Sequence, residues 1–109
     1  EAALRAARAL FYQTLDDIWR WVSSGKEVTT AQRADILLAA TKASESSVRV
    51  VERMHTLAGT TGIYSGNPIE RCFRDIQVAR QHRFYTEGRY ETFGRMYFGL
   101  EPDYGMVML

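Results

Sequence analysis

The sequence contains few of the residues that cross-link or interrupt a chain. Cys72 is the one cysteine among 109 residues, so no disulfide can form within the chain, and the reducing cytoplasm is the default compartment. The sequence has no run of about 18 apolar residues and no charged segment leading into an apolar one. These absences exclude a disulfide-rich secreted domain, and we expect no membrane partner.

An excess of charge of one sign is also missing. The chain has 14 Lys and Arg against 13 Asp and Glu, which gives a net charge of +1. Proteins that bind nucleic acid gather basic residues on one surface, so we expect no nucleic-acid partner. His55 and His82 are the only histidines, and no pair of carboxylates stands near them at ligand spacing. We therefore expect no metal site.

Glycine and proline are scarce in the first half of the chain. Only Gly25 of the eight glycines precedes residue 59, and both prolines come later. Apolar residues recur there at spacings of three and four, which predicts two amphipathic helices joined by a turn at 23–26. In the first helix they are Leu4, Ala7, Phe11, Leu15, Ile18 and Val22. Thr29 and Gln32 form a capping box for the second helix, which we expect to end at Gly59.

Two further helices are predicted in the second half. Asn67 is placed as an N-cap, with proline directly after it, and this third helix is expected to end before Gly88. A fourth helix is expected from Arg89 to Phe98, followed by an irregular, apolar tail over 99–109. The hydrophobic content of 46% is too high for a disordered chain, and 109 residues are too few for two domains. We therefore expect one all-α domain over residues 1–109.

Two features of this second half could carry chemistry. His82 follows Asp75 by seven residues, which places both on one face of the predicted third helix. A histidine near a helix C-terminus also interacts favourably with the helix dipole, so the pattern leaves both roles open. The segment 58–62 offers backbone N–H groups and two hydroxyls to a phosphate or a flavin edge. Two glycines between helices, however, usually mark a simple turn.

The order of four motifs resembles the C-terminal domain of the flavin-dependent monooxygenases that have the acyl-CoA dehydrogenase fold. The third motif is followed by His82 at a distance of seven residues. The motifs are Ala58-Gly59-Thr60-Thr61-Gly62-Ile63-Tyr64, Asn67-Pro68-Ile69-Glu70-Arg71, Arg74-Asp75 and Tyr90-Glu91-Thr92-Phe93-Gly94-Arg95. The resemblance covers about residues 54 to 100 by motif and the preceding hairpin by pattern.

The resemblance implies an up-and-down four-helix bundle that is the C-terminal part of a longer enzyme and assembles as a homotetramer. It further implies reduced flavin, either FMN or FAD, delivered by a separate flavin reductase, and hydroxylation of a small aromatic or heteroatom substrate with oxygen. By correspondence, Gly59, Thr60 and Gln81 would contact the flavin, and His82 would act beside flavin and substrate. Gln77 stands where this family often has histidine, so the substrate stays open.

Two other functions fit parts of the sequence. Acyl-CoA dehydrogenases share the Arg-Asp motif, but many carry Tyr-Glu-Gly-Thr soon after it. Here Tyr85-Thr86-Glu87-Gly88 breaks that motif and lies too far from Asp75, which favours the monooxygenases. A non-enzymatic helical oligomerisation module would account for the aromatic tail. In either enzymatic interpretation, the 109 residues alone are expected to be inactive.

Overall fold

The computed structural model of the chain describes residues 1–83, 86 and 88–103. These residues form α1 (Ala2–Ser23), α2 (Thr30–Ala58), the short 3₁₀ helix η1 (Gly59–Ile63), α3 (Pro68–Ala79) and α4 (Arg89–Tyr97). No strand occurs in these residues, so the predicted all-α class is confirmed. The predicted apolar tail lies largely at 104–109, outside the described residues.

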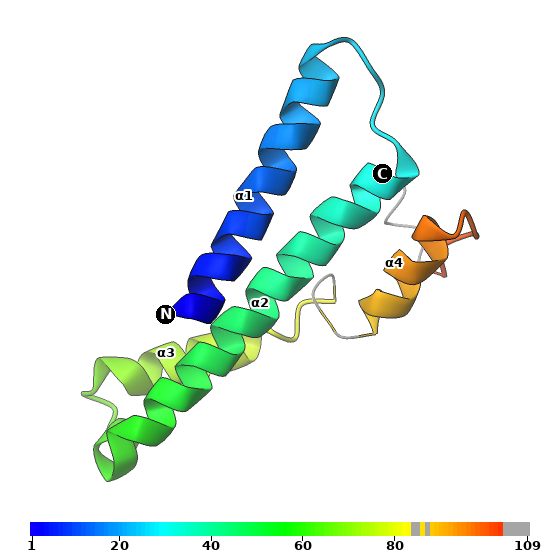
Figure 1. Cartoon of the computed structure of the whole chain (residues 1–109). Helices are drawn as coiled ribbons and strands as arrows, with labels where there is room; N and C mark the ends of the chain where they lie inside the picture. The colour runs from blue at the N-terminus through cyan, green and yellow to red at the C-terminus, as the bar shows by residue number, and fades with distance from the viewer. Residues whose placement is uncertain (84–85, 87, 104–109) are drawn as a thin grey trace.

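Helix α2 is the centre of the fold (Figure 1). The chain runs along α1, reverses along α2 and turns back along the C-terminal half of α2 as α3. Helix α4 lies against the N-terminal half of α2, where the Tyr97 hydroxyl reaches Asp35. Among the described residues, α1, α3 and α4 each approach α2, and none of the three approaches another. The predicted up-and-down path is thus built around one long helix.

Local capping determines where the two central helices begin. The Thr29 hydroxyl accepts a hydrogen bond from the Gln32 amide at 3.2 Å, and the Gln32 side chain accepts one from the Thr29 amide at 3.0 Å. At α3, the Asn67 side chain accepts from the Ile69 amide at 3.0 Å, and Pro68 occupies the first turn. Each cap satisfies backbone donors that lack an intrahelical partner. Both predicted helix starts are confirmed.

Helix α3 is shorter than the sequence indicates. It ends at Ala79 rather than just before Gly88, so His82 lies beyond the helix and does not share a helical face with Asp75. The amides of Gln81 and His82 bond back three residues, to Val78 and Ala79, in a tightened final turn. The prediction was wrong because residues 80–83 are polar and exposed, so further helix would bury no apolar surface.

The core is small and lies on two faces of α2. Between α1 and α2, the buried apolar residues are Ala7, Ile18 and Ala39. Between α2 and α4, Met96 packs on Ala34, and Phe93 is 2% exposed. Several positions of the predicted stripe in α1 stay at least a third exposed, among them Leu4, Leu15 and Val22. The pattern therefore identifies the correct face of α1, which the described chain covers only partly.

We expect the stability of the α2–α4 contact to fall in alkaline solution. Burial, together with the 2.5 Å hydrogen bond that Tyr97 donates to Asp35, raises the Tyr97 pKa to about 12. An unfolded tyrosine titrates near pH 10, so this contribution is fully present below pH 10 and is lost as pH rises to 12. Urea unfolding of Tyr97→Phe should therefore depend less steeply on pH in that window than the parent chain does. Equal pH dependence in both proteins would contradict the expectation.

Candidate functional site

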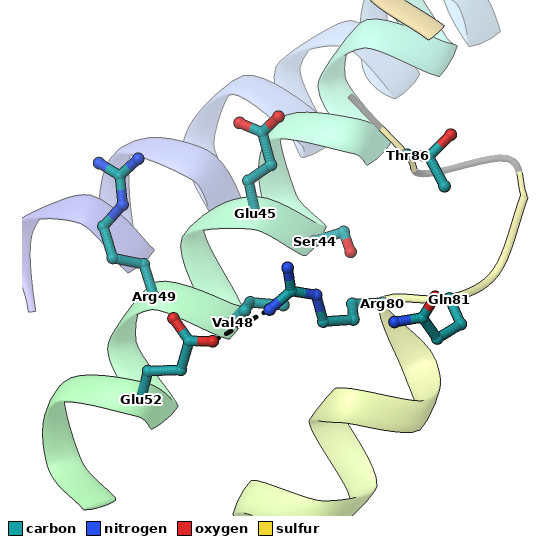
Figure 2. Close-up of a pocket in the computed structure, with 8 residues that line it drawn as sticks. All are labelled: Ser44, Glu45, Val48, Arg49, Glu52, Arg80, Gln81 and Thr86. Carbon is teal, nitrogen blue, oxygen red and sulfur yellow. Dashed lines mark hydrogen bonds and ion pairs between the residues drawn. The ribbon is translucent and has the colours of Figure 1, made fainter. Parts of the chain in front are cut away.

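A cavity of about 420 Å³ lies between the middle of α2 and the segment that follows α3 (Figure 2). All of its lining residues except Val48 are polar or charged. They are Ser44, Glu45, Val48, Arg49, Glu52, Arg80, Gln81 and Thr86. Its volume falls within the range of about 300 to 1,000 Å³ that is usual for small-molecule sites. This cavity is the candidate functional site.

One wall of the cavity is a hydrogen-bonded network that joins α2 to the end of α3. Glu52 Oε1 accepts from Gln77 Nε2 at 3.1 Å and from Arg80 Nη1 at 3.0 Å. Arg80 Nη1 also donates to Gln77 Oε1 at 3.2 Å. The other carboxylate of the cavity, Glu45, pairs within α2 with Lys42 at 3.3 Å. The network therefore holds the C-terminal end of α3 against α2.

The four predicted site residues divide into two pairs. Gln81 lines the cavity, and His82 follows it on an exposed stretch of chain. Gly59 and Thr60 lie in η1, at the opposite end of α3. Helix α3 has 12 residues, so the pairs are separated by a helix of about 18 Å. Of the four, only Gln81 is among the described residues that line the cavity, His82 is its neighbour in the chain, and Gly59 and Thr60 lie away from it.

The charged residues of the Arg-Asp motif are paired within their own helix. Arg74 Nε lies 2.6 Å from Glu70 Oε1, and this carboxylate raises the pKa of Arg74. Arg71 Nε lies 3.6 Å from Asp75 Oδ2. Both partners lie in α3 itself, one turn away, at the spacing that brings helical side chains together.

Segment 58–62 is a hydrogen-bonded turn in which Gly59 and Thr60 stay exposed. Its backbone forms η1, the Thr61 hydroxyl donates to the Ala58 carbonyl at 2.6 Å, and Asn67 donates to the Thr61 carbonyl at 3.0 Å. Gly59 has a positive φ of 59°, and nothing lies within 4 Å of where its Cβ would be. The exposed backbone at Gly59 and Thr60 is thus open to a ligand from outside the chain.

The side chain of His55, in the last turn of α2, packs against η1 and α3. Its ring stacks on Phe73 with centroids 4.2 Å apart and an interplanar angle of 23°. The buried Gly62 completes the contact, because a Cβ there would lie 3.5 Å from His55 Cδ2 and 3.2 Å from Ala58 Cβ. His55 is therefore a packing residue at the junction of α2, η1 and α3.

We expect Gly62→Ala to destabilise the chain by about 1 to 3 kcal/mol, since the added methyl must displace Ala58 or the His55–Phe73 stack. Urea unfolding followed by circular dichroism measures the change. Gly66→Ala is the matched control, because Gly66 is exposed and a Cβ there meets nothing within 4 Å. Equal effects of the two substitutions would show that Gly62 is not packed as described.

Two features are absent from the part of the chain that the structure describes. In 1–83, 86 and 88–103, no group of three or more His, Cys, Asp or Glu side chains is arranged to hold a metal ion. Within the same residues, no helix combines the length and the apolar character needed to cross a membrane.

The sequence offered no signal for the Glu52–Gln77–Arg80 network. Glu52 is separated from Gln77 by 25 positions and from Arg80 by 28. Periodicity detects partners three or four residues apart, whereas these contacts depend on how α3 packs along α2. Gln77 stood out only as a departure from the histidine common in the family that the sequence resembles.

Comparison with known proteins identifies relatives of the whole segment. The sequence profile described as "Acyl-CoA dehydrogenase, C-terminal domain" matches residues 1–87.

An indole-3-acetate monooxygenase of Acinetobacter baumannii is 38% identical over 107 residues, covering 98% of this chain and 28% of that protein. A second indole-3-acetate monooxygenase, from Pseudomonas putida, is 38% identical over 94% of this chain and 26% of its own length. The flavin-dependent monooxygenase oxygenase subunit HsaA of Mycobacterium tuberculosis is 30% identical over 85% of this chain and 24% of its own length. This chain thus spans about a quarter of the length of the curated relatives it matches.

Proposed function

This chain belongs to the family of acyl-CoA dehydrogenase C-terminal domains, and from that premise we propose that it is the C-terminal, flavin-binding part of a two-component monooxygenase. One observation carries the proposal: relatives 38% identical over 94% and 98% of the chain are named monooxygenases. The proposed substrate is a small aromatic compound, and indole-3-acetate is the first candidate to test. We further propose that the full protein is cytoplasmic and that a separate reductase supplies its reduced FMN or FAD.

The residues present are compatible with a flavin. The Gln81 amide and the hydroxyls of Ser44 and Thr86 offer both donors and acceptors to the polar edge of a ring system. Gly59 and Thr60 offer exposed backbone. Because α3 separates the two pairs, we propose that Gln81 and His82 of one chain and Gly59 and Thr60 of another contact the same flavin in the assembled protein. Backbone N–H groups near a glycine suit an anionic part of such a cofactor.

In this proposal, bound reduced flavin supplies the two electrons that split O₂, so that one oxygen atom enters the substrate and the other leaves as water. The imidazole of His82 donates a hydrogen bond to an oxygen of the substrate and holds or releases a proton there. The Gln81 side chain, which lines the cavity, orients the bound ring system.

We propose that the full protein is a homotetramer. Large apolar side chains are exposed on all four described α-helices, in η1 and directly after α4, including Trp19 at 73%, Leu57 at 80% and Phe98 at 84%. Surfaces of this kind are typically covered in an assembly. Light scattering of the full-length protein should give the mass of four chains, and a monomer at micromolar concentration would contradict this part of the proposal.

Labelled oxygen gas tests the proposed reaction. The full-length protein is supplied with a flavin reductase, NADH, FMN or FAD, indole-3-acetate and isotopically labelled O₂. Mass spectrometry should then detect a product that has gained one labelled oxygen atom. Hydrogen peroxide alone, with indole-3-acetate and with a panel of phenols, would contradict the proposal. Bleaching of bound oxidised flavin by an acyl-CoA thioester would indicate a dehydrogenase, and no flavin binding in a stable oligomer would indicate an oligomerisation module.

The 109 residues produced alone are expected to give no turnover in the same assay. The chain corresponds to 28% and 26% of the two indole-3-acetate monooxygenases. A flavin site shared with other parts of the protein is incomplete in such a piece. Product formation by this piece would contradict the expectation.

A further inference from the structure

We infer that Glu52 is a positioning residue for the proposed reaction: by holding Arg80, it fixes the Gln81–His82 segment against α2. The inference rests on the proposed function, because it concerns how His82 reaches its working position. Glu52 itself is assigned no contact with flavin or substrate.

Two donors from α3 converge on one oxygen of Glu52. Gln77 Nε2 and Arg80 Nη1 both reach Glu52 Oε1, at 3.1 and 3.0 Å, so one oxygen on α2 binds the last turn of α3 and the residue that caps it. Figure 2 shows the bond from Arg80 to Glu52. The bond from Arg80 is charge-assisted and is therefore stronger than a bond between neutral groups. Arg80 also donates to Gln77 Oε1 at 3.2 Å, which closes the network on itself.

The network lies directly before the segment that carries Gln81 and His82. Arg80 stands directly before Gln81 and two residues before His82, where the helix has ended. Exposed residues after a helix end have no apolar burial to hold them in one place. A polar tie at Arg80 therefore restricts the segment where packing does not. Displacing a reacting group by about 1 Å can cost up to about 100-fold in rate.

The Glu52–Arg80 ion pair is exposed, so its effect on position can be separated from its effect on stability. The side chains of Arg80 and Glu52 are 45% and 43% exposed. Ion pairs exposed to this extent contribute little to the free energy of folding. Removing Glu52 should therefore leave the helices folded and release the segment after α3. This separation makes the inference testable.

The chain offers a matched control and a conservative variant. Asp17 lies in α1, outside the lining of the cavity, and its carboxylate forms an exposed ion pair at 3.4 Å with Arg20 of the same helix. Asp17→Ala therefore removes a carboxylate and its ion pair without removing the tie. Glu52→Gln keeps an oxygen that can accept from both Gln77 and Arg80, and so keeps the geometry while losing the charge.

The experiment uses the full-length protein with its reductase, flavin, oxygen and indole-3-acetate. We expect Glu52→Ala to lower kcat by about 10- to 100-fold with KM changed less than about twofold, because uniform substrate binding is retained. Glu52→Gln should recover most of the lost kcat, and Asp17→Ala should resemble the parent. The inference is overturned if Glu52→Ala has the parental kcat, if Asp17→Ala lowers kcat equally, or if Glu52→Gln is as impaired as Glu52→Ala.

Amide hydrogen exchange gives a second readout that needs no turnover. The amides of Gln81 and His82 are bonded to Val78 and Ala79, each at 3.1 Å, and should be protected. In Glu52→Ala, their exchange should be faster by about 3- to 10-fold, the equivalent of one net hydrogen bond, with little change in Asp17→Ala. Unchanged exchange would overturn the inference. If the parent enzyme makes no oxygenated product, the proposed function fails, and the exchange result alone decides whether Glu52 holds this segment. If Glu52→Ala does not fold, Arg80→Met replaces it, because this change removes the same tie from the other side, with the same expected acceleration and the same overturning result.

Discussion

Replacing His82 by alanine in the full-length protein is expected to lower the yield of oxygenated product by about 100-fold, the usual effect of losing a positioned proton donor or acceptor. The imidazole is the one side chain that changes charge in the physiological range without a shifted pKa. Consumption of oxygen is expected to continue, with hydrogen peroxide in place of product. Product per NADH consumed is the quantity to measure.

His55→Ala is the control for this substitution. His55 stacks on Phe73 at the other end of α3, so its loss should lower the thermal midpoint and leave the ratio of product to NADH unchanged. A His82→Ala enzyme that hydroxylates at the parental rate and yield would exclude His82 from the reaction. It would also leave the Gln81 side of the cavity without an assigned proton carrier.

Replacing Phe93 by alanine is expected to destabilise the chain by about 3 to 5 kcal/mol, the cost of a large cavity in a core. Phe93 belongs to α4, and its side chain is 2% exposed at the contact of α4 with α2. Its ring meets the Tyr90 ring edge-on, with centroids 6.1 Å apart. The described core contains few large side chains, so little neighbouring volume is available to refill the space. Urea unfolding followed by circular dichroism measures the effect.

Phe98→Ala is the matched control, because it makes the same chemical change directly after the same helix. Phe98 is 84% exposed, so the expected change is within about 0.5 kcal/mol. This value applies to the dissociated chain, since a partner subunit covering Phe98 would add its own contribution. Similar destabilisation by both substitutions at low protein concentration would contradict the described placement of α4.

The parts of the fold that the sequence predicts are those determined within a few residues. Thr29 with Gln32, and Asn67 with Pro68, form caps whose partners lie close in sequence, and both helix starts are found where expected. The end of α3 was mispredicted because residues 80–83 are exposed in the folded chain. Their exposure depends on how α3 packs on α2, which no local pattern shows. The Tyr97–Asp35 bond joins residues 62 positions apart, a contact that no local pattern encodes.

The candidate site divides in the same way. Gln81 was identified by its place after a motif, and the structure puts it in the cavity wall. Glu52 was not identified, because a glutamate on a helix surface has the same local pattern whether or not it has a partner on another helix. Residues with a role set by tertiary contacts become visible only when the helices are placed together.

The arrangement of α3 and α4 along α2 also determines how the molecule can open. Among the described residues, α3 and α4 contact opposite halves of α2 and do not approach each other. Either helix can therefore detach while the other stays bound, which gives two separate units of local unfolding. A ligand or subunit that covers one half of α2 would slow amide exchange there and leave the other half unchanged. The native-state exchange pattern would therefore show which half a given ligand or subunit binds.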